Sequence, residues 1–278
     1  MGIDVAESRK GIDLVALDAG RATVAAYAGR TVDEIARLVL ETLRPDVVCI
    51  DSPSQWAPPG QRREAERSLT RRGINLYTTP SELRARAFHG WMRQGFGIYQ
   101  ALGSVYPRYR GGAVRGTAAE YYPHLSSVAL RGYIGDIRKK RKKLEFRRAV
   151  LEEHGIAVAE LRGQDQVDAA LGALTGLIAL EGGHTWVGLD EDALLVPLRD
   201  LPDRFVRMQS IGEMATPASL GGRSRRSCQR PPCECGCGVE GPGRFRPGHD
   251  AKLRSRLLKA ADIGDGEAAA ELARRGWH

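Results

Sequence analysis

Asp46-Val47-Val48-Cys49-Ile50-Asp51 is the stretch of sequence that decides the fold. Its apolar residues do not alternate with polar ones, which is the pattern of a strand covered on both faces. A helical pattern over 31–43 precedes it and ends at Arg44-Pro45. Still earlier, three short apolar runs separated by tight turns predict strands at 3–6, 13–17 and 23–27. The sequence therefore predicts an α/β fold with a mixed sheet flanked by helices.

The elements after this strand continue the same pattern. Helices are predicted at 61–72, 141–153, 166–180 and 266–276, and strands at 118–122, 186–189 and 194–197. The region 81–103 is helical in pattern, but Gly90, Gly95 and Gly97 predict that it is broken or mobile. Periodicity is lost over 201–230. We therefore expect a main domain at 1–203, a linker at 204–227 and a small C-terminal module at 228–278.

The composition is that of a globular protein. Of 278 residues, 42% are hydrophobic and 27% charged. No apolar run approaches the roughly 18 residues that a membrane span needs, so a membrane protein is excluded. The first residues, MGIDVAESRK, are acidic where a secretory signal would be apolar, so we expect a cytoplasmic protein.

The positive charge is distributed unevenly. Residues 204–278 hold 14 basic and 8 acidic residues, whereas 1–203 are nearly balanced, with 28 basic and 26 acidic. Four of the seven lysines lie in one basic run, which predicts contacts with the phosphate backbone of DNA or RNA. The equally plausible alternative is a solvated helix face. The run consists of Arg138, Lys139, Lys140, Arg141, Lys142 and Lys143.

Five carboxylates stand at the ends of elements or inside them. Asp4 lies within the first strand, Asp51 ends the buried strand, and Glu120 lies in the strand 118–122. Asp165 and Asp168 are three residues apart, on one face of a helix. Asp165 or Asp51 could instead cap a helix or a turn. Asp4 has no such structural role available, because a buried carboxylate is costly unless it is paired or binds a metal ion.

Crowded carboxylates suit a pair of hard divalent ions, Mg²⁺ or Mn²⁺. Two such ions can activate water and stabilise the leaving oxygen of a phosphodiester. His124, just after Glu120, is the best general-acid candidate by proximity.

Four segments, in this order, carry a resemblance to a known family: Gly2-Ile3-Asp4-Val5-Ala6, Ile50-Asp51-Ser52-Pro53, Glu120-Tyr121-Tyr122-Pro123 and Asp165-Gln166-Val167-Asp168-Ala169. Residues 1–200 resemble a bacterial family of predicted RNase H-like nucleases, and also the Holliday-junction resolvases of the RNase H-like fold. In those resolvases the acidic residues come from the first strand, the fourth strand and a final helix. The resemblance implies two-metal phosphodiester hydrolysis. It also implies that Asp4 bridges the metal ions, that Asp51, Glu120 and Asp168 complete the catalytic metal site, and that Asp165 assists.

The C-terminal module is rich in cysteine. Cys233, Cys235 and Cys237 alternate with other residues across a glycine-containing turn, and His249 could close a tetrahedral Zn²⁺ site, with Cys228 as an alternative ligand. A redox-active or fortuitous thiol cluster is the other possibility. The segment resembles a small Cys-X-Cys-Gly-Cys-Gly…Pro-Gly-His-Asp module of phage and bacterial proteins. So short a module buries little core, so we expect structural zinc to stabilise it.

The predicted function is a metal-dependent nuclease, and two alternatives remain open. One is a nucleic-acid-binding protein whose acidic cluster is structural. The other is an actin-like ATPase, which also begins with an Asp-bearing strand and hairpin but needs glycine-rich phosphate loops. The first hairpin, Ser8-Arg9-Lys10-Gly11, is poor in glycine, which makes the ATPase the weaker alternative.

Overall fold

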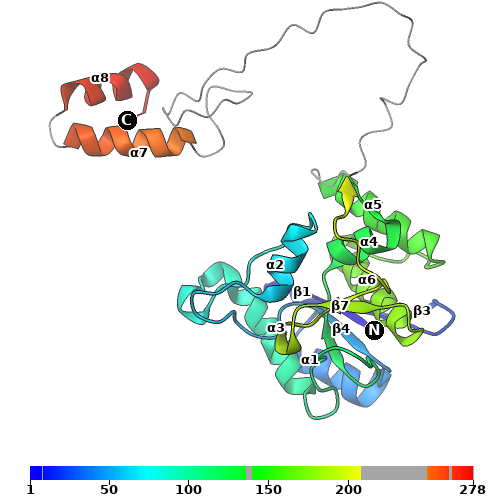
Figure 1. Ribbon diagram of the computed structural model, residues 1–278. Coiled ribbons are helices and arrows are strands. Elements are labelled where there is room, and N and C mark those ends of the chain that lie inside the picture. The colour runs from blue at the N-terminus through cyan, green and yellow to red at the C-terminus, as the bar shows by residue number, and fades with distance from the viewer. Residues whose placement is uncertain (8, 136–139, 208–248, 263–264, 278) are drawn as a thin grey trace, which may run out of the picture. The chain divides into compact units, whose positions relative to one another are not determined.

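The computed structural model describes residues 1–7, 9–135, 140–207, 249–262 and 265–277 (Figure 1). The chain divides into two compact units, Met1–Glu213 and Met214–His278. Every helix and strand that bears on the candidate site belongs to the first unit.

A mixed sheet organises the first unit. Among the described residues it contains seven strands in the order β3-β2-β1-β4-β5-β8-β7. β1, β4, β5 and β8 run parallel, while β2, β3 and β7 are antiparallel to their neighbours. The strands are β1 (Gly2–Val5), β2 (Ile12–Leu17), β3 (Thr23–Arg30), β4 (Val48–Asp51), β5 (Ala118–Glu120), β7 (Thr185–Val187) and β8 (Leu194–Val196). The predicted mixed α/β sheet is thus confirmed.

Two short strands lie outside the main sheet. β6 (Tyr133–Ile134) pairs with β9 (Val206–Arg207) in a parallel ribbon. Neither strand is predicted by the sequence, because two residues are too few for a period-2 pattern to be visible.

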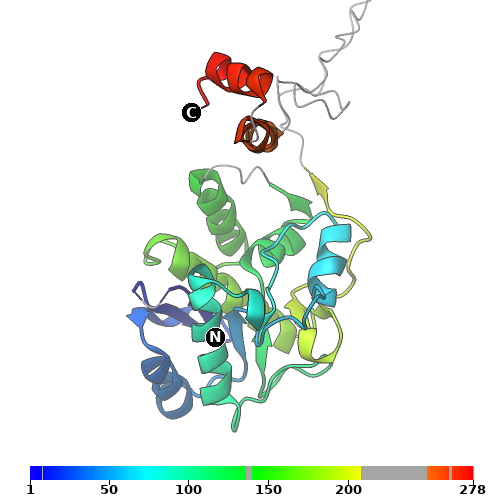
Figure 2. The same cartoon turned by 90° about the vertical axis from the view of Figure 1, so that its left-hand side faces the viewer.

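Helices cover both faces of the sheet (Figures 1 and 2). One core cluster joins β1, β2 and β4 to α1 and α3, and other clusters join the opposite face to α6. The helices of this unit are α1 (Val32–Arg37) with its π-helical continuation η1 (Leu38–Leu43), α2 (Glu64–Arg71), α3 (Gly90–Leu102), α4 (Pro123–Arg131), α5 (Lys140–Glu153) and α6 (Gly163–Leu180). Short 3₁₀ turns form η2 (Glu82–Arg84), η3 (Ala87–His89) and η4 (Asp190–Asp192).

The local signals explain where the first elements begin and end. Thr31 caps α1 in a reciprocal capping box with Glu34, as the pattern of the sequence predicts. Val48, Cys49 and Ile50 of β4 are completely buried, which confirms that this strand is covered on both faces. The chain after β4 leaves the sheet at its carboxyl edge, where Asp51 is the last strand residue.

Two helices of the first unit differ from the sequence-based expectation. The region 81–103 is broken before Gly90, into η2, η3 and α3, but α3 continues through Gly95 and Gly97. Gly95 allows α3 to pack closely against Ser52, which a Cβ there would overlap. The whole of α4 is unexpected. It starts with Pro123 at its first turn, a favoured place for proline, and ends at Gly132 with a positive φ of 76°.

The second unit contains a pair of helices, α7 (His249–Asp262) and α8 (Gly266–Arg275). Asp265 caps α8 by accepting hydrogen bonds from the backbone N–H groups of Glu267 and Ala268, both at 3.0 Å. Leu253 is buried against Leu257 and Trp277. The terminal helix lies where the sequence predicts it.

None of the helices in the described part of the chain has the length and apolar character needed to cross a bilayer.

Candidate active site

Two aspartates face each other at the carboxyl edge of the sheet. Asp4 of β1 and Asp51 of β4 are direct partners in a parallel register. Partners in register point to the same face of a sheet, so both carboxylates lie on the face that α6 covers. Asp4 is buried and Asp51 is partly buried.

Asp168 brings a third carboxylate from α6. This helix lies unusually close to β1 because Gly2 has no side chain: a Cβ there would overlap the carbonyl oxygen of Ala169. The hydroxyl of Tyr121 donates a hydrogen bond to the backbone carbonyl of Asp168 at 2.7 Å and ties the helix to the strand next to β4. Three of the predicted site residues are thereby brought together.

Asp165 lies one turn earlier on α6. Its carboxylate forms an ion pair with Lys10, in the turn between β1 and β2. The side-chain hydrogen bond to Asp165 is the main cause that raises the pKa of Lys10, so this lysine stays charged. Asp165 therefore lies at the edge of the aspartate cluster, where it pairs with Lys10.

The three clustered carboxyls repel one another. Burial, followed by the charges of Asp51 and Asp168, raises the pKa of Asp4 well above its usual range. Burial and the nearby Asp168 raise the pKa of Asp51 to about 8. Burial also raises the pKa of Asp168, although Arg147 and Lys143 oppose the shift. At neutral pH the cluster must therefore hold protons or attract cations.

Two basic side chains of α5 supply part of that positive charge. Arg147 is buried and forms an ion pair with Asp168, while its Nε has no hydrogen-bond partner among the described residues. Lys143, one turn earlier on the same face, is half-buried. Burial and the Arg147 charge lower the pKa of Lys143, and the aspartates oppose this shift. The sequence pattern does not single out Arg147, because its helix is rich in basic residues.

The fit of the cluster to a divalent ion depends on Asp4 and Asp51. In the described part of the chain neither side chain has a hydrogen bond or an ion pair, whereas Asp168 is taken by Arg147 and by Gln164 at 3.3 Å. Within the described residues, no group of three His, Cys, Asp or Glu side chains is arranged to hold a metal ion. Mg²⁺ commonly uses one or two protein carboxylates together with water and substrate phosphate. The Asp4–Asp51 pair fits one such ion.

Glu120 lies apart from this cluster. It is in register with Ile50 and not with Asp51, so its side chain points to the opposite face of the sheet. Arg63 donates to both of its carboxylate oxygens, at 2.9 and 2.6 Å, and to Asp192 at 2.8 Å. Burial raises the pKa of Glu120, and Arg63 opposes that shift. The structure therefore places this predicted metal ligand in a buried ion-pair network.

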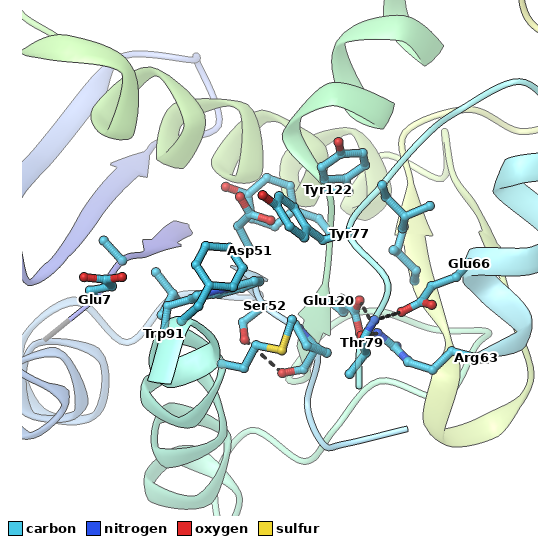
Figure 3. Close-up of a pocket in the computed structure, with 18 of the residues that line it drawn as sticks. Glu7, Asp51, Ser52, Arg63, Glu66, Tyr77, Thr79, Trp91, Glu120 and Tyr122 are labelled. Atoms are coloured by element: carbon cyan, nitrogen blue, oxygen red, sulfur yellow. Dashed lines mark hydrogen bonds and ion pairs between the residues drawn. The ribbon is translucent and has the colours of Figure 1, made fainter. Parts of the chain in front are cut away.

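A pocket of about 780 Å³ opens beside Asp51. Figure 3 shows Asp51, Tyr77 and Trp91 in the middle of the pocket, with Glu7 to one side and the Arg63–Glu120 pair to the other. Asp51 and Glu120 both line it, so the two faces of the sheet edge meet at this cavity. The remaining lining includes Lys10 and several aromatic side chains.

His124 is unsuited to the predicted role of general acid. Its ring is buried in α4, and Nδ1 has no partner within the described residues. Burial, together with the positive charges of Arg147 and Lys143, lowers its pKa to about 4. At pH 7 the ring is neutral and lacks the proton that a general acid gives up.

The basic run and the cysteine module are only partly described. Arg138 and Lys139 lie outside the described residues, and so does the side chain of Lys140. Arg141 is exposed and pairs with Glu145, and Lys142 also interacts with another residue. For the predicted zinc site, Cys228, Cys233, Cys235, Cys237 and the side chain of His249 all lie outside the described residues.

Comparison with known proteins gives one match. Neither the curated proteins nor the solved structures contain a significant match to the chain. A family model covers most of the main sheet and the whole aspartate cluster. Through residues 2–192, the chain belongs to the family described as "Protein of unknown function (DUF429)".

Proposed function

We propose that the protein is a Mg²⁺- or Mn²⁺-dependent nuclease that hydrolyses phosphodiester bonds of nucleic acid. The observation that carries the proposal is the facing pair of Asp4 and Asp51, buried or partly buried and without a partner among the described residues. Charge left uncompensated at such depth is costly, and a divalent cation is the partner that carboxylate oxygens favour.

The arrangement of the sheet supports an RNase H-like fold for this nuclease. The resemblance implies acidic residues on the first strand, the fourth strand and a final helix. Asp4, Asp51 and Asp168 come from β1, β4 and α6, in that order. A long helix packed across β1 and β4 is what allows the three carboxylates to meet.

Each residue of the cluster has a distinct proposed task. Asp4 and Asp51 would hold a metal ion, and Asp168 would complete the site for a second ion when Arg147 pairs with a substrate phosphate instead. The two bound metal ions would activate a water molecule and stabilise the leaving oxygen. Lys10 and Lys143 attract the phosphate backbone. We assign Glu120 to holding Arg63 in place, and Asp165 to holding Lys10.

The zinc module belongs to the same proposal. Cys233, Cys235, Cys237 and His249 would bind one structural Zn²⁺, with Cys228 as the alternative ligand, and the surrounding arginines would add affinity for nucleic acid. Zinc content measured on the purified chain, with and without Cys235→Ser, tests this part independently of catalysis.

Cleavage of a panel of labelled nucleic acids tests the nuclease itself. The panel should include single-stranded, duplex, hybrid and branched DNA and RNA, with Mn²⁺, Mg²⁺ or EDTA. We expect metal-dependent cleavage of at least one member, and a loss of at least about a hundredfold in Asp4→Asn, because a metal ligand is removed. Asp200→Asn, a change at an exposed carboxylate in a loop, is the matched control and should cleave normally.

The Arg147–Asp168 ion pair favours one alternative, a nucleic-acid-binding protein without hydrolytic activity. In that case the arginine would neutralise the cluster permanently. Binding of the same panel without cleavage in any metal, or equal cleavage by wild type and Asp4→Asn, would refute the nuclease.

A further inference from the structure

Aromatic side chains form one wall of the pocket beside Asp51. Tyr77, Phe88 and Trp91 all line it. Tyr77 is 67% exposed and Phe88 is 51% exposed, and the centroids of these two rings are 5.6 Å apart at a tilt of 42°. Neighbouring aromatic rings left open at a cavity mark a binding surface, because an ordinary solvated surface seldom groups them.

Fixed polar groups form the opposite wall. Glu66 is buried, and one of its carboxylate oxygens accepts a hydrogen bond from the backbone N–H of Thr79 at 2.7 Å. Arg63 and Glu120 hold each other in the two-bond ion pair described above. Figure 3 shows these four residues as a connected group. Such carboxylates can accept hydrogen bonds from the ring and exocyclic N–H groups of a nucleobase.

The acidic side chains in the pocket favour an uncharged base over an anionic phosphate. Asp51, Glu66 and Glu120 line the interior, and Arg63 is the basic residue among them. An anionic phosphate would be repelled there, whereas an uncharged base would be accepted. Arg9 and Lys10 also line the pocket, where they pair with Glu7 and Asp165.

More positive charge lies along the chain beside the aromatic wall. Arg84 and Arg86 flank it and are exposed, and within the described residues no acidic side chain pairs with either of them. A phosphate next to the bound base could therefore contact cations outside the pocket while it lies near Asp51.

From this arrangement we infer that the pocket binds an unpaired nucleobase, stacked on Tyr77 and Phe88, with its phosphate at the metal ion that Asp4 and Asp51 would hold. The inference rests on the proposed nuclease function and gives it a substrate class, single-stranded nucleic acid or an unpaired region of a duplex. A base within a duplex is stacked and paired, so its faces and its edge are not available to the two walls.

Fluorescence anisotropy with labelled oligonucleotides tests this inference. The full chain carrying Asp4→Asn keeps the oligonucleotide intact, and the probes are a single strand and its matched duplex. We expect the single strand to bind more tightly than the duplex. Tyr77→Ala and Phe88→Ala should each weaken single-strand binding by about tenfold, the scale of one lost stacking contact, and leave duplex binding unchanged.

Two further variants separate stacking from general damage. Tyr77→Phe keeps an aromatic face and should bind like the parent. Trp186→Leu removes an aromatic side chain, 41% exposed, from edge strand β7 outside the pocket, and should also bind like the parent. Thermal unfolding verifies that each variant is folded, which we expect because Tyr77 and Phe88 are exposed.

The possible results separate this inference from the proposed function. Equal affinity for single strand and duplex, or unchanged binding by both alanine variants, overturns the base pocket, and metal-dependent cleavage by wild type would still support the nuclease. Single-strand binding that depends on Tyr77 and Phe88, without cleavage by wild type, supports the pocket and refutes hydrolysis. Binding of an aromatic peptide instead of either oligonucleotide overturns the inference as well.

Discussion

The carboxylates on the two faces of the sheet differ in their ion pairing. On one face, Glu120 is matched by two hydrogen bonds from Arg63, which also holds Asp192. On the other face, Asp4 and Asp51 stand opposite each other without a partner among the described residues. A fully paired network connects α2 to the sheet, whereas the unpaired Asp4 and Asp51 repel each other, and a bound cation would relieve that repulsion. On this difference we place the proposed chemistry on the face covered by α6.

The largest loss of stability is expected when the ion pairs of Arg63 with Glu120 and Asp192 are broken. Arg63→Met leaves Glu120 buried, and Asp192 partly buried, without the guanidinium, so we expect a loss of about 3–5 kcal/mol in the free energy of unfolding. Urea unfolding measures this loss, and Mn²⁺ should not restore it. Arg67→Ala breaks only an exposed pair with Glu64 and should cost at most about 1 kcal/mol. Similar losses for the two variants would contradict a structural role for Arg63.

Arg147→Met is expected to have a smaller effect that depends on metal. Removing the guanidinium leaves Asp168 opposed to Asp4 and Asp51, so in EDTA we expect a loss of about 3 kcal/mol, at the lower end for a broken buried pair because a single carboxylate loses its partner. Mn²⁺ at about a hundred times its Kd should return up to about 2.7 kcal/mol, because the ion binds the folded state alone. Urea unfolding with EDTA and with Mn²⁺ gives both values. If Mn²⁺ rescues Arg147→Met no better than Arg63→Met, the two faces do not differ as described.

The smallest effect is a dependence of stability on pH. Asp51 loses its proton near 3.8 when unfolded and at about 8 when folded. Between those values the folded chain keeps a proton that the unfolded chain has released, so stability falls as pH rises from about 4 to about 8 and then levels off. In EDTA at pH 8, Asp51→Asn should therefore be more stable than wild type, because the neutral amide avoids the cost of the buried charge. Urea unfolding across this range checks the slope. A variant less stable than wild type at pH 8 would show that the Asp51 charge is compensated.

Much of the sheet could be predicted from local pattern, but the face that each side chain occupies could not. The uninterrupted apolar run predicts β4, and the apolar residues around Asp4 predict β1. The sequence also predicts that the carboxylates of Asp4 and Asp51 lie close together. Glu120 occupies a three-residue strand, where the face depends on the register with β4, and a shift of one residue exchanges the faces. The register between two strands is set by tertiary contacts, so the sequence pattern alone could not separate Glu120 from Asp4 and Asp51.

The missed partners of the carboxylates have a similar origin. Arg63 and Arg147 lie in helices rich in basic residues, where local pattern does not distinguish a buried arginine from a solvated one. Helix α4 was missed because Pro123 suggests the end of a strand as readily as the start of a helix. The continuous course of α3 depends on the contact of Gly95 with Ser52, which lies far away in the sequence.

Gly2 has a consequence for how the site could change over evolution. The spacing between the carboxylates on the strands and the one on α6 depends on the close approach that this glycine permits. Mg²⁺ requires oxygen ligands at about 2.0–2.1 Å, whereas Ca²⁺ accepts about 2.3–2.6 Å. A single methyl group at this position would push the helix outward and separate the ligands without altering any of them. In the proposed nuclease, the ion preference of the cluster would therefore rest partly on a residue that has no side chain and takes no part in binding.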